Sequence, residues 1–429
     1  MTNIKGTMLL PGDEGFEQAA KPWNLSVAQP VAAVVEAQDA DDVAAVVRHA
    51  RQVGLSVTAQ PSGHGASGDT EGAILLRTGR LDEVRINADE RWARVGAGAR
   101  WGRVQAAAGA HGLTALAGSS PVVSVAGYTL GGGLSWFSRA YGWAADSVRA
   151  FETVDADGTR ARVSADSDSD ADLFWALRGG GGDYALVTAI EFDLYPAPHL
   201  YGGRMIWHAD RTAEVLAAFR EITAEAPPEL SVWLNRLRFP SAPPMVAVDV
   251  TYLGESAEAQ SLLGRLDKID GVMSDTRADM AVADLGDIAA EPKDPGPALS
   301  RAELLTGLDD SAVEILLAEP TEPLINVQLR HLGGALAEQG QGAAAAVSEP
   351  YLLYMLGLSL NPQLAQAVTS AQDRLVRALD GYVSGRKAYT FLAPGERAAD
   401  AFPEETAARL REIKRARDPQ RVIRANFPV

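Results

Sequence analysis

A short glycine-rich segment, 63-GHGASG-68, constrains the fold of this chain more than any other stretch. Its glycines have the G-x-G-x-x-G spacing of a dinucleotide phosphate loop, which requires a helix directly after the loop. Residues 72–78, however, form a short apolar run between turn signals, and both this run and residues 55–60 predict strands. We therefore expect a loop between two strands, not a Rossmann loop, and we expect backbone N–H groups to bind a phosphate there.

Two further glycine clusters, 131–133 and 179–182, lie in the same half of the chain as the serine-rich turn at 118–120. Glycine permits close approach and positive φ, so successive N–H groups can converge on an anion. A single cluster would indicate only a tight turn, whereas three clusters favour a bulky phosphate-bearing cofactor. His64, inside the first cluster, is open to two interpretations: an ordinary hydrogen-bonding loop residue or a functional imidazole.

Charge and composition narrow the partners of the chain. Its 429 residues carry a formal net charge of -17, which repels nucleic acid and anionic lipid, so neither is an expected partner. The chain has no cysteine, which excludes disulfides and thiolate ligands, and we expect no metal site. The N-terminal segment lacks the pattern of a signal peptide, and no apolar run approaches about 18 residues, so we expect a cytoplasmic protein.

Strand and helix signals alternate through the first half in an α+β pattern with short strands. The expected strands are 30–37, 55–60, 72–78 and 184–196, the hairpins are 83–98 and 147–164, and the helices are 41–54, 101–112 and 170–178. The hairpin at 147–164 turns at Asp157-Gly158, a strong hairpin signal. Residues 118–136 are poor in charge and predict a long loop with buried turns.

The sequence changes character after Pro196 and Pro198. Beyond this point we expect helices at 210–226 and 403–420, strands at 231–239, 245–254 and 323–334, and an exposed loop at 341–350. These strands and helices predict an antiparallel sheet backed by helices. The length of the chain also favours two domains.

Four segments together resemble one protein family. They are 61-PSGHG-65, 118-GSSPVVSVAGYTLGGGLSW-136, 173-LFWALRGGGGDYALVTAIEF-192 and 418-DPQRVIRANFPV-429. In this order the chain resembles the FAD-linked oxidases of the vanillyl-alcohol oxidase and p-cresol methylhydroxylase superfamily, berberine bridge enzyme-like branch. The resemblance implies a two-domain α+β fold of the PCMH type. Residues 1–198 would bind FAD, 199–395 would form an antiparallel-sheet substrate domain, and 396–429 would return to the FAD-binding domain.

The resemblance also implies which residues hold FAD. His64 matches the histidine whose ring nitrogen is bonded to the 8α-methyl carbon of the flavin in that family. Val187 lies where a backbone contact to the adenine end is expected. The other matching positions are Ser62, Gly63, Gly65, Ala66, Gly118, Ser119, Ser120, Gly127, Tyr128, Gly131 and Asn426.

Three positions depart from the family pattern. Ser120 stands where doubly linked members carry a cysteine, so at most one covalent bond to the flavin can form. Gln60 stands where an arginine often precedes the histidine by four residues. The Tyr-x-Asn-aromatic signature near the C-terminus is reduced to 389-YTFL-392, so its asparagine is missing.

The activity implied by the resemblance is that of an FAD-dependent oxidase. Such an enzyme takes a hydride onto flavin N5 from a small or ring-bearing alcohol or amine and passes the electrons to dioxygen. A secondary-metabolite intermediate is one substrate that fits this description. The catalytic candidates are Tyr389, Tyr128, Arg330 and His331. A phenol with an unshifted pKa of about 10 is a poor base at neutral pH unless a cation lowers that pKa.

Period two along the strand at 323–334 places Asn326, Gln328 and Arg330 on one face and His331 on the other. Structural interpretations stay open beside the catalytic ones: Arg330 could pair with a carboxylate, and His331 could be a satisfied core histidine. Further side chains would line an aromatic pocket or belong to the core. They are Trp233, Asn235, Tyr351, Tyr354 and Phe391.

Two other functional classes remain open at this point. The flavin fold could serve a cyclisation or rearrangement in natural-product biosynthesis, for which an isomeric product and no oxygen uptake would be diagnostic. The chain could also bind flavin without turnover, for which a reduced flavin inert towards dioxygen would be diagnostic. The sequence leaves the substrate, the electron acceptor and the oligomeric state open.

Overall fold

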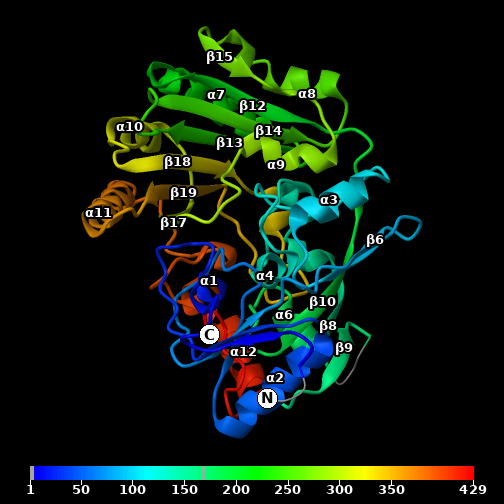
Figure 1. Ribbon diagram of the computed structural model, residues 1–429. Coiled ribbons are helices and arrows are strands. Elements are labelled where there is room, and N and C mark those ends of the chain that lie inside the picture. Colours follow the sequence, from blue (N-terminus) through cyan, green and yellow to red (C-terminus); the bar gives the residue numbers. More distant parts are fainter. Residues whose placement is uncertain (1–3, 167–169) are drawn as a thin grey trace.

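The computed structural model describes residues 4–166 and 170–429. It has an α+β architecture built around three sheets with antiparallel pairing in each. In Figure 1 a large sheet with its helices lies above the blue, teal and red elements that carry both ends of the chain. The expected fold class, α+β with antiparallel sheets, is confirmed.

The glycine loop at residues 63–68 joins two strands of the four-stranded sheet. Its order is β1 (Thr7–Leu9), β2 (Ala33–Glu36), β4 (Ile74–Arg77) and β3 (Val57–Ala59), with β4 parallel to both β2 and β3. Helix α2 (Ala40–Val53) connects β2 to β3; the Asp39 carboxylate accepts from the N–H groups of Asp41 and Asp42, and Gly54 ends the helix with φ 73°. The loop therefore joins two strands and no helix follows it, as the sequence predicts.

The five-stranded sheet is antiparallel throughout. Its order is β5 (Val84–Asn87), β6 (Trp92–Gly96), β10 (Leu186–Asp193), β8 (Val148–Val154) and β9 (Arg160–Ser164). One face packs against α3 (Trp101–Gly109) and α6 (Ala171–Leu177), with Phe151, Ile190 and Phe192 in the buried cluster. A two-stranded pair, β7 (Leu113–Thr114) with β11 (Tyr195–Pro196), lies beside it.

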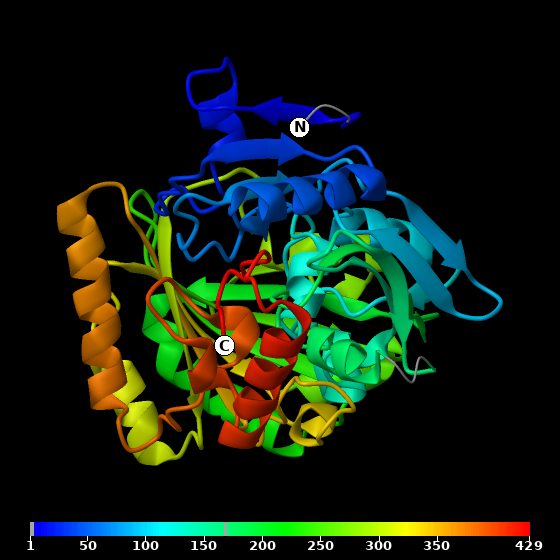
Figure 2. The same cartoon turned by 90° about the horizontal axis from the view of Figure 1, so that it is seen from below.

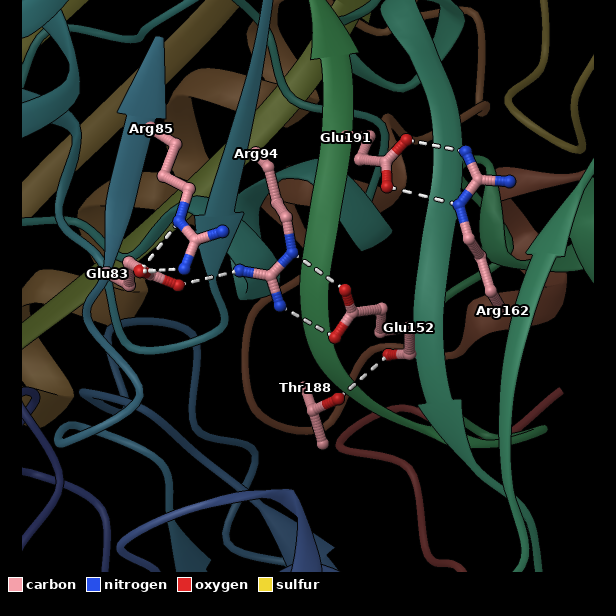
Figure 3. Close-up of polar contacts among 7 residues, drawn as sticks. All are labelled: Glu83, Arg85, Arg94, Glu152, Arg162, Thr188 and Glu191. Carbon is pink, nitrogen blue, oxygen red and sulfur yellow. Dashed lines mark hydrogen bonds and ion pairs between the residues drawn. The ribbon is translucent and has the colours of Figure 1, made fainter.

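The opposite face of this sheet carries a ladder of ion pairs (Figure 3). Arg94 bonds both carboxylate oxygens of Glu152 at 2.7 Å and reaches Glu83 at 2.9 Å. Arg162 bonds Glu191 at 3.1 and 2.6 Å. Opposite charges on neighbouring strands stabilise such a sheet by a few tenths of a kcal/mol per pair. This face is therefore solvated, and the core lies on the other side.

The large sheet contains seven strands in one path. Its order is β15 (Val272–Asp275), β12 (Tyr201–His208), β14 (Met245–Tyr252), β13 (Leu230–Leu237), β18 (Leu324–His331), β19 (Tyr351–Leu358) and β17 (Ala298–Leu305), and β16 (Ala278–Asp279) pairs with β12. One face is covered by α7 (Thr212–Glu225), α8 (Ser256–Leu263), α10 (Asp310–Ala318) and α11 (Pro362–Ala378). The other face is turned towards the rest of the molecule, where α9 (Leu285–Ala289) packs on β12.

The C-terminal segment returns to the five-stranded sheet. Helix α12 (Glu404–Arg417), red in Figures 1 and 2, packs on α6 and contributes Leu410 and Ile413 to the cluster that contains Phe174. The division at residues 198 and 395 stays a proposal. The two buried clusters support it. The cluster of the large sheet begins at Tyr201, and Leu392 belongs to the cluster of the five-stranded sheet.

Short helices complete the described ranges. They are α1 (Phe16–Ala20), α4 (Val125–Leu130) and α5 (Ser138–Tyr141). Helix α4 lies inside the segment 118–136. The sequence predicts this segment as a loop, because its few apolar residues show no helical repeat. None of the helices in the described ranges combines the length and apolar character needed to cross a membrane.

Candidate cofactor and substrate site

The glycine loop between β3 and β4 presents unpaired backbone donors. The N–H groups of residues 62–65 donate to no acceptor in the described part of the chain, whereas the carbonyl of Ser62 accepts from Trp23 N at 3.0 Å. Gly63 has φ 77°, and a Cβ at this position would lie 3.0 Å from Pro22. Only glycine fits there, and the four neighbouring donors can bind an anion.

The C-terminal tail holds this loop in place. The Oδ1 of Asn426 accepts from Ser67 N at 2.8 Å, and its Nδ2 donates to the carbonyl of Gly65. The preceding Ala425 N donates to Asp183 at 3.1 Å, just after the third glycine cluster. Two glycine clusters and the end of the chain are thereby tied into one site.

His64 has one ring nitrogen engaged and one free. Its Nδ1 lies 2.7 Å from Ser62 Oγ, and its ring stacks on Trp23 with centroids 4.2 Å apart. Its Nε2 is buried without a hydrogen-bond partner among the described residues. Burial, helped by the charge of Arg100, lowers the pKa of His64 to about 4, so the imidazole is neutral at physiological pH. When Nδ1–H donates to Ser62, Nε2 presents a lone pair.

The second and third glycine clusters pack around two tyrosines. A Cβ at Gly133 would lie 2.4 Å from the ring of Tyr128, and one at Gly181 would lie 2.4 Å from the hydroxyl of Tyr389. The Tyr389 hydroxyl donates to the carbonyl of Phe427 at 3.0 Å, whereas the Tyr128 hydroxyl is buried without a partner in the described ranges. Burial raises the pKa of Tyr128 well above its usual value, although the nearby charge of Arg330 opposes this.

A polar network covers the centre of the large sheet on the face without helices. Arg330 Nε donates to Gln328 at 2.6 Å, Gln328 to Asn235 at 2.7 Å, and Asn235 to Asp249 at 2.9 Å. Arg204 binds both oxygens of Asp249, at 2.5 and 2.8 Å. The network is buried, and it connects β18, β13, β14 and β12 in that order.

Aromatic rings surround the guanidinium of Arg330. Its carbon lies 4.0 Å from the ring centre of Trp233, 5.2 Å from Phe391 and 5.7 Å from Tyr354. Trp233 in turn stacks on Trp136 at 3.5 Å, and Trp136 follows the second glycine cluster in the chain. The face of the large sheet and the glycine loops are therefore in direct contact.

Glu291 joins the same region from the segment before β17. Its Oε1 accepts from the hydroxyl of Ser119 at 2.6 Å. Burial lowers the pKa of Arg330, and the carboxylate of Glu291 is the strongest opposing influence. A carboxylate, a buried guanidinium and the Tyr128 hydroxyl thus lie near one another between the glycine loops and the large sheet.

Comparison with known proteins agrees with this geometry. Residues 31–164 match the family model of the FAD binding domain. The (R)-6-hydroxynicotine oxidase of Paenarthrobacter nicotinovorans is 26% identical over 465 residues, covering 100% of this chain and 97% of that protein. The structure of 6-hydroxy-D-nicotine oxidase from Arthrobacter nicotinovorans superposes with a TM-score of 0.86 at 23% identity, covering 100% and 98% of the two chains.

A third similar protein is the wild-type BBE-like 1 protein of Physcomitrella patens. Its structure has a TM-score of 0.85 at 21% identity and covers 99% of this chain and 96% of its own. Over its full length the chain is therefore similar in sequence to an FAD-linked oxidase, and its fold is that of the berberine bridge enzyme-like proteins. It is an FAD-dependent oxidoreductase.

The residues of this chain fit FAD. The free N–H groups at 62–65 suit a pyrophosphate, and the N–H groups of residues 118–120 likewise donate to no acceptor in the residues described. The buried Nε2 of His64 and hydroxyl of Tyr128 are polar atoms that a bound group would have to satisfy.

The other residues predicted to contact the cofactor lie on these loops or near them. Ala66 is buried in the first loop, Gly127 lies in α4, and Gly131 follows α4. Val187 lies on β10 beside a bulge in the pairing with β8. Their contacts with FAD, and those of Ser120, stay predictions.

The four catalytic candidates lie in three different places. Tyr128 and Arg330 lie together between the glycine loops and the large sheet. Tyr389 lies among the glycines with its hydroxyl engaged, and burial raises its pKa. His331 lies on the helix-covered face of β18, where its Nε2 is 3.0 Å from Arg139 Nη1, and burial lowers its pKa to about 3. His331 therefore contacts Arg139 of α5 and lies on the opposite face of β18 from Arg330.

The expected aromatic pocket is present in part. Trp233, Tyr354 and Phe391 surround Arg330. Tyr351 does not join them, because odd positions of β19 point to the other face, where its hydroxyl lies 2.8 Å from that of Thr223. Of the two interpretations left open for Tyr351, pocket or core, the structure supports the core.

Sequence reasoning missed three charged residues of this site. Asp249 has a signal in the sequence, because a carboxylate inside the apolar run 245-MVAVDVTY-252 needs a partner. Arg204, the partner of Asp249, and the more distant Glu291 have no such signal in the sequence, since only the folded chain brings them to this face.

Proposed function

We propose that this chain is an FAD-dependent oxidase whose FAD is bonded to His64. Its substrate would be a small ring-bearing alcohol or amine, and dioxygen would accept the electrons. The observation that carries the proposal is the first glycine loop, where free backbone donors lie beside a neutral, buried histidine with an unpartnered Nε2. The similarity to a hydroxynicotine oxidase over the full chain supports the oxidase chemistry.

The chain supplies binding and orientation. Backbone N–H groups of the glycine loops would hold the pyrophosphate, and His64 would fix the flavin ring. Asn426 accepts from Ser67 N and so holds the first loop. FAD, when bound, accepts a hydride and returns the electrons to dioxygen. The substrate carbon that bears the hydroxyl loses a hydride, the hydroxyl loses a proton, and a carbonyl forms. Dioxygen gains two electrons and two protons and becomes hydrogen peroxide.

Glu291 is the carboxylate placed to take the proton of the substrate. Its Oε1 accepts from Ser119, and its Oε2 accepts no hydrogen bond from the residues described, so a second acceptor site stays open. Tyr128 has a raised pKa and stays protonated at neutral pH, so it can donate a hydrogen bond to substrate oxygen but is no base.

The oxidase reaction can be tested without knowledge of the substrate. Purified protein, freed of unbound flavin by gel filtration, is reduced with dithionite under nitrogen and then mixed with air-saturated buffer. We expect the yellow absorbance to return within seconds with one hydrogen peroxide per flavin. A reduced flavin that stays colourless in air would contradict the oxidase and favour a flavin-binding protein without turnover.

A substrate, once found, separates the oxidase from a cyclase. An oxidase releases a product two hydrogens lighter than its substrate and consumes one dioxygen per product. A product isomeric with the substrate, formed with no oxygen uptake, would contradict the proposal and establish a rearrangement on the same fold.

A further inference from the structure

Arg330 is a buried cation without an ion-pair partner. Its side chain projects from the penultimate residue of β18, an inner strand of the large sheet, with 6% of its surface exposed. Only its Nε has a hydrogen bond, to Gln328. Neither Nη group donates to an acceptor in residues 4–166 or 170–429, and no carboxylate in these ranges forms an ion pair with it. A buried guanidinium in this condition is costly unless a ligand pairs with it.

The carboxylates closest to this network are already engaged. Asp249 accepts two hydrogen bonds from Arg204 and a third from Asn235, so its charge is neutralised. Glu291 is bound to Ser119 and attracts Arg330 without closing an ion pair with it. On this face of the sheet Arg204 and Asp249 balance each other, whereas Arg330 has the carboxylate of Glu291 near it but forms no ion pair within the described residues.

The position of Arg330 is fixed by its neighbours. Its guanidinium stacks on Trp233 at 4.0 Å, and Trp233 is held by Trp136 at 3.5 Å. The hydrogen bond to Gln328 fixes the rotation of the guanidinium plane, because Gln328 is itself bound to Asn235. The guanidinium is stacked on a ring and bound at Nε, so its two Nη groups can donate to a planar acceptor such as a carboxylate.

Aromatic rings surround the guanidinium group. Phe391 and Tyr354 lie 5.2 and 5.7 Å from the guanidinium carbon, and the half-buried Tyr128 interacts electrostatically with it. Rings on several sides of a fixed cation suit a flat ligand that joins an apolar ring to an anionic group.

We propose that the substrate of this chain is an aromatic or conjugated ring compound that carries a carboxylate, and that Arg330 binds this carboxylate through its two Nη groups. The inference rests on the proposed function, since it names the substrate class of the same site. It makes Arg330 a specificity-determining residue that is not required for binding FAD.

The test uses the flavin-loaded protein and three simple probes. Benzoate, benzamide and benzylamine share one ring and differ in charge, and isothermal titration calorimetry measures the binding of each. We expect benzoate to bind at least about tenfold more tightly than benzamide, because hydrogen bonds to a charged group contribute about 1.5–3 kcal/mol. Benzylamine should bind most weakly, since its charge has the sign of Arg330.

Variants assign this preference to one residue. Arg330→Gln should lose about tenfold or more in benzoate affinity and leave benzamide unchanged, and Arg330→Lys should retain part of the preference. Arg238→Gln is the matched control, because it removes the same charge from an ion pair with Glu322 just beyond the end of β13. We expect no change there. The comparison of probes on the unaltered protein stands even where Arg330→Gln does not fold.

Equal affinities for benzoate and benzamide on yellow, flavin-loaded protein would overturn the inference and leave the proposed function intact. So would an Arg330→Gln variant that alters the flavin spectrum without ligand and still prefers benzoate, because Arg330 would then serve the flavin. A protein that holds no flavin would instead contradict the proposed function.

Discussion

His64 illustrates how the surroundings of one side chain determine its chemistry. An exposed histidine is partly charged near neutral pH, whereas burial beside Arg100 keeps this ring neutral down to a pKa of about 4. Ser62 engages Nδ1, and Trp23 holds the plane of the ring. A fixed neutral imidazole with one free nitrogen is what a bond to an electrophilic carbon requires.

His331 makes the stability of the protein sensitive to acid. Burial and the positive charge of Arg139 lower its pKa from 6.5 to about 3. Between these values the unfolded chain binds a proton and the folded chain does not, so the free energy of unfolding falls as pH decreases below about 6.5. This residue alone should cost about 2 kcal/mol at pH 5 relative to pH 7.

Urea denaturation of the unaltered protein and of His331→Gln at pH 7 and pH 5 measures this effect. Glutamine can still accept a hydrogen bond from Arg139 but does not titrate, so the loss of stability between the two pH values should shrink by about 2 kcal/mol. The exposed His208→Gln serves as control. An unchanged pH dependence in His331→Gln would show that the histidine is not buried in a neutral state.

Single residues could be predicted from the sequence where a spacing or a period fixed them. His64 was placed by the glycine spacing, and alternation placed Gln328 and Arg330 on one face of β18, as their hydrogen bond confirms. Tyr351 could not be placed, because its strand was not recognised. Glu291 comes from an irregular segment, and only the folded chain brings it to Ser119.

At the scale of elements, the short helix α5 holds the large sheet to the glycine loops through Arg139. The guanidinium of Arg139 donates to the carbonyls of Leu230, Leu332, Ala226 and Pro227 and to His331 Nε2. Burial lowers the pKa of Arg139 to about 10, which leaves it charged at neutral pH. One side chain thus satisfies acceptors at the ends of three segments.

We expect Arg139→Ala to lower the free energy of unfolding by about 3 kcal/mol or more, because four carbonyls and an imidazole lose a buried donor. Arg149→Ala is the matched control: it breaks an exposed ion pair with Asp193 and should cost less than about 1 kcal/mol. Chemical denaturation of both variants measures the difference. Equal losses would mean that α5 does not secure the large sheet.

Elements with a clear period were predicted and others were not. Helix α2 and strands β13, β14 and β18 were found because their apolar positions repeat and turn signals end them. Strand β19 was missed, since the apolar run 351-YLLYMLGL-358 has no period that separates strand from helix. The segment 341–350 was expected to be exposed, which is wrong: Ala343 and Ala344 are buried, and Ala344 packs against Gly179.

At the scale of the whole molecule, the site is assembled from segments far apart in the chain. The glycine loop follows β3, the polar network lies on the large sheet, and Asn426 comes from the last residues. Local patterns predicted the α+β class and the antiparallel sheet, and the order of motifs indicated the resemblance to FAD-linked oxidases. The pairing of Asn426 with the loop at Ser67 leaves no trace in composition or period, so it required the structure.

The acid stability of the flavin tests the central claim, that the first glycine loop holds FAD and that His64 is bonded to it. The purified protein is precipitated with acid, and the absorbance of pellet and supernatant is measured for the unaltered chain, for His64→Ala and for the exposed His111→Ala as control. We expect colour in the pellet of the unaltered chain and of His111→Ala and none in that of His64→Ala. Colour released into the supernatant of the unaltered protein would contradict the bond to His64, and a colourless protein after reconstitution with FAD would contradict the site itself.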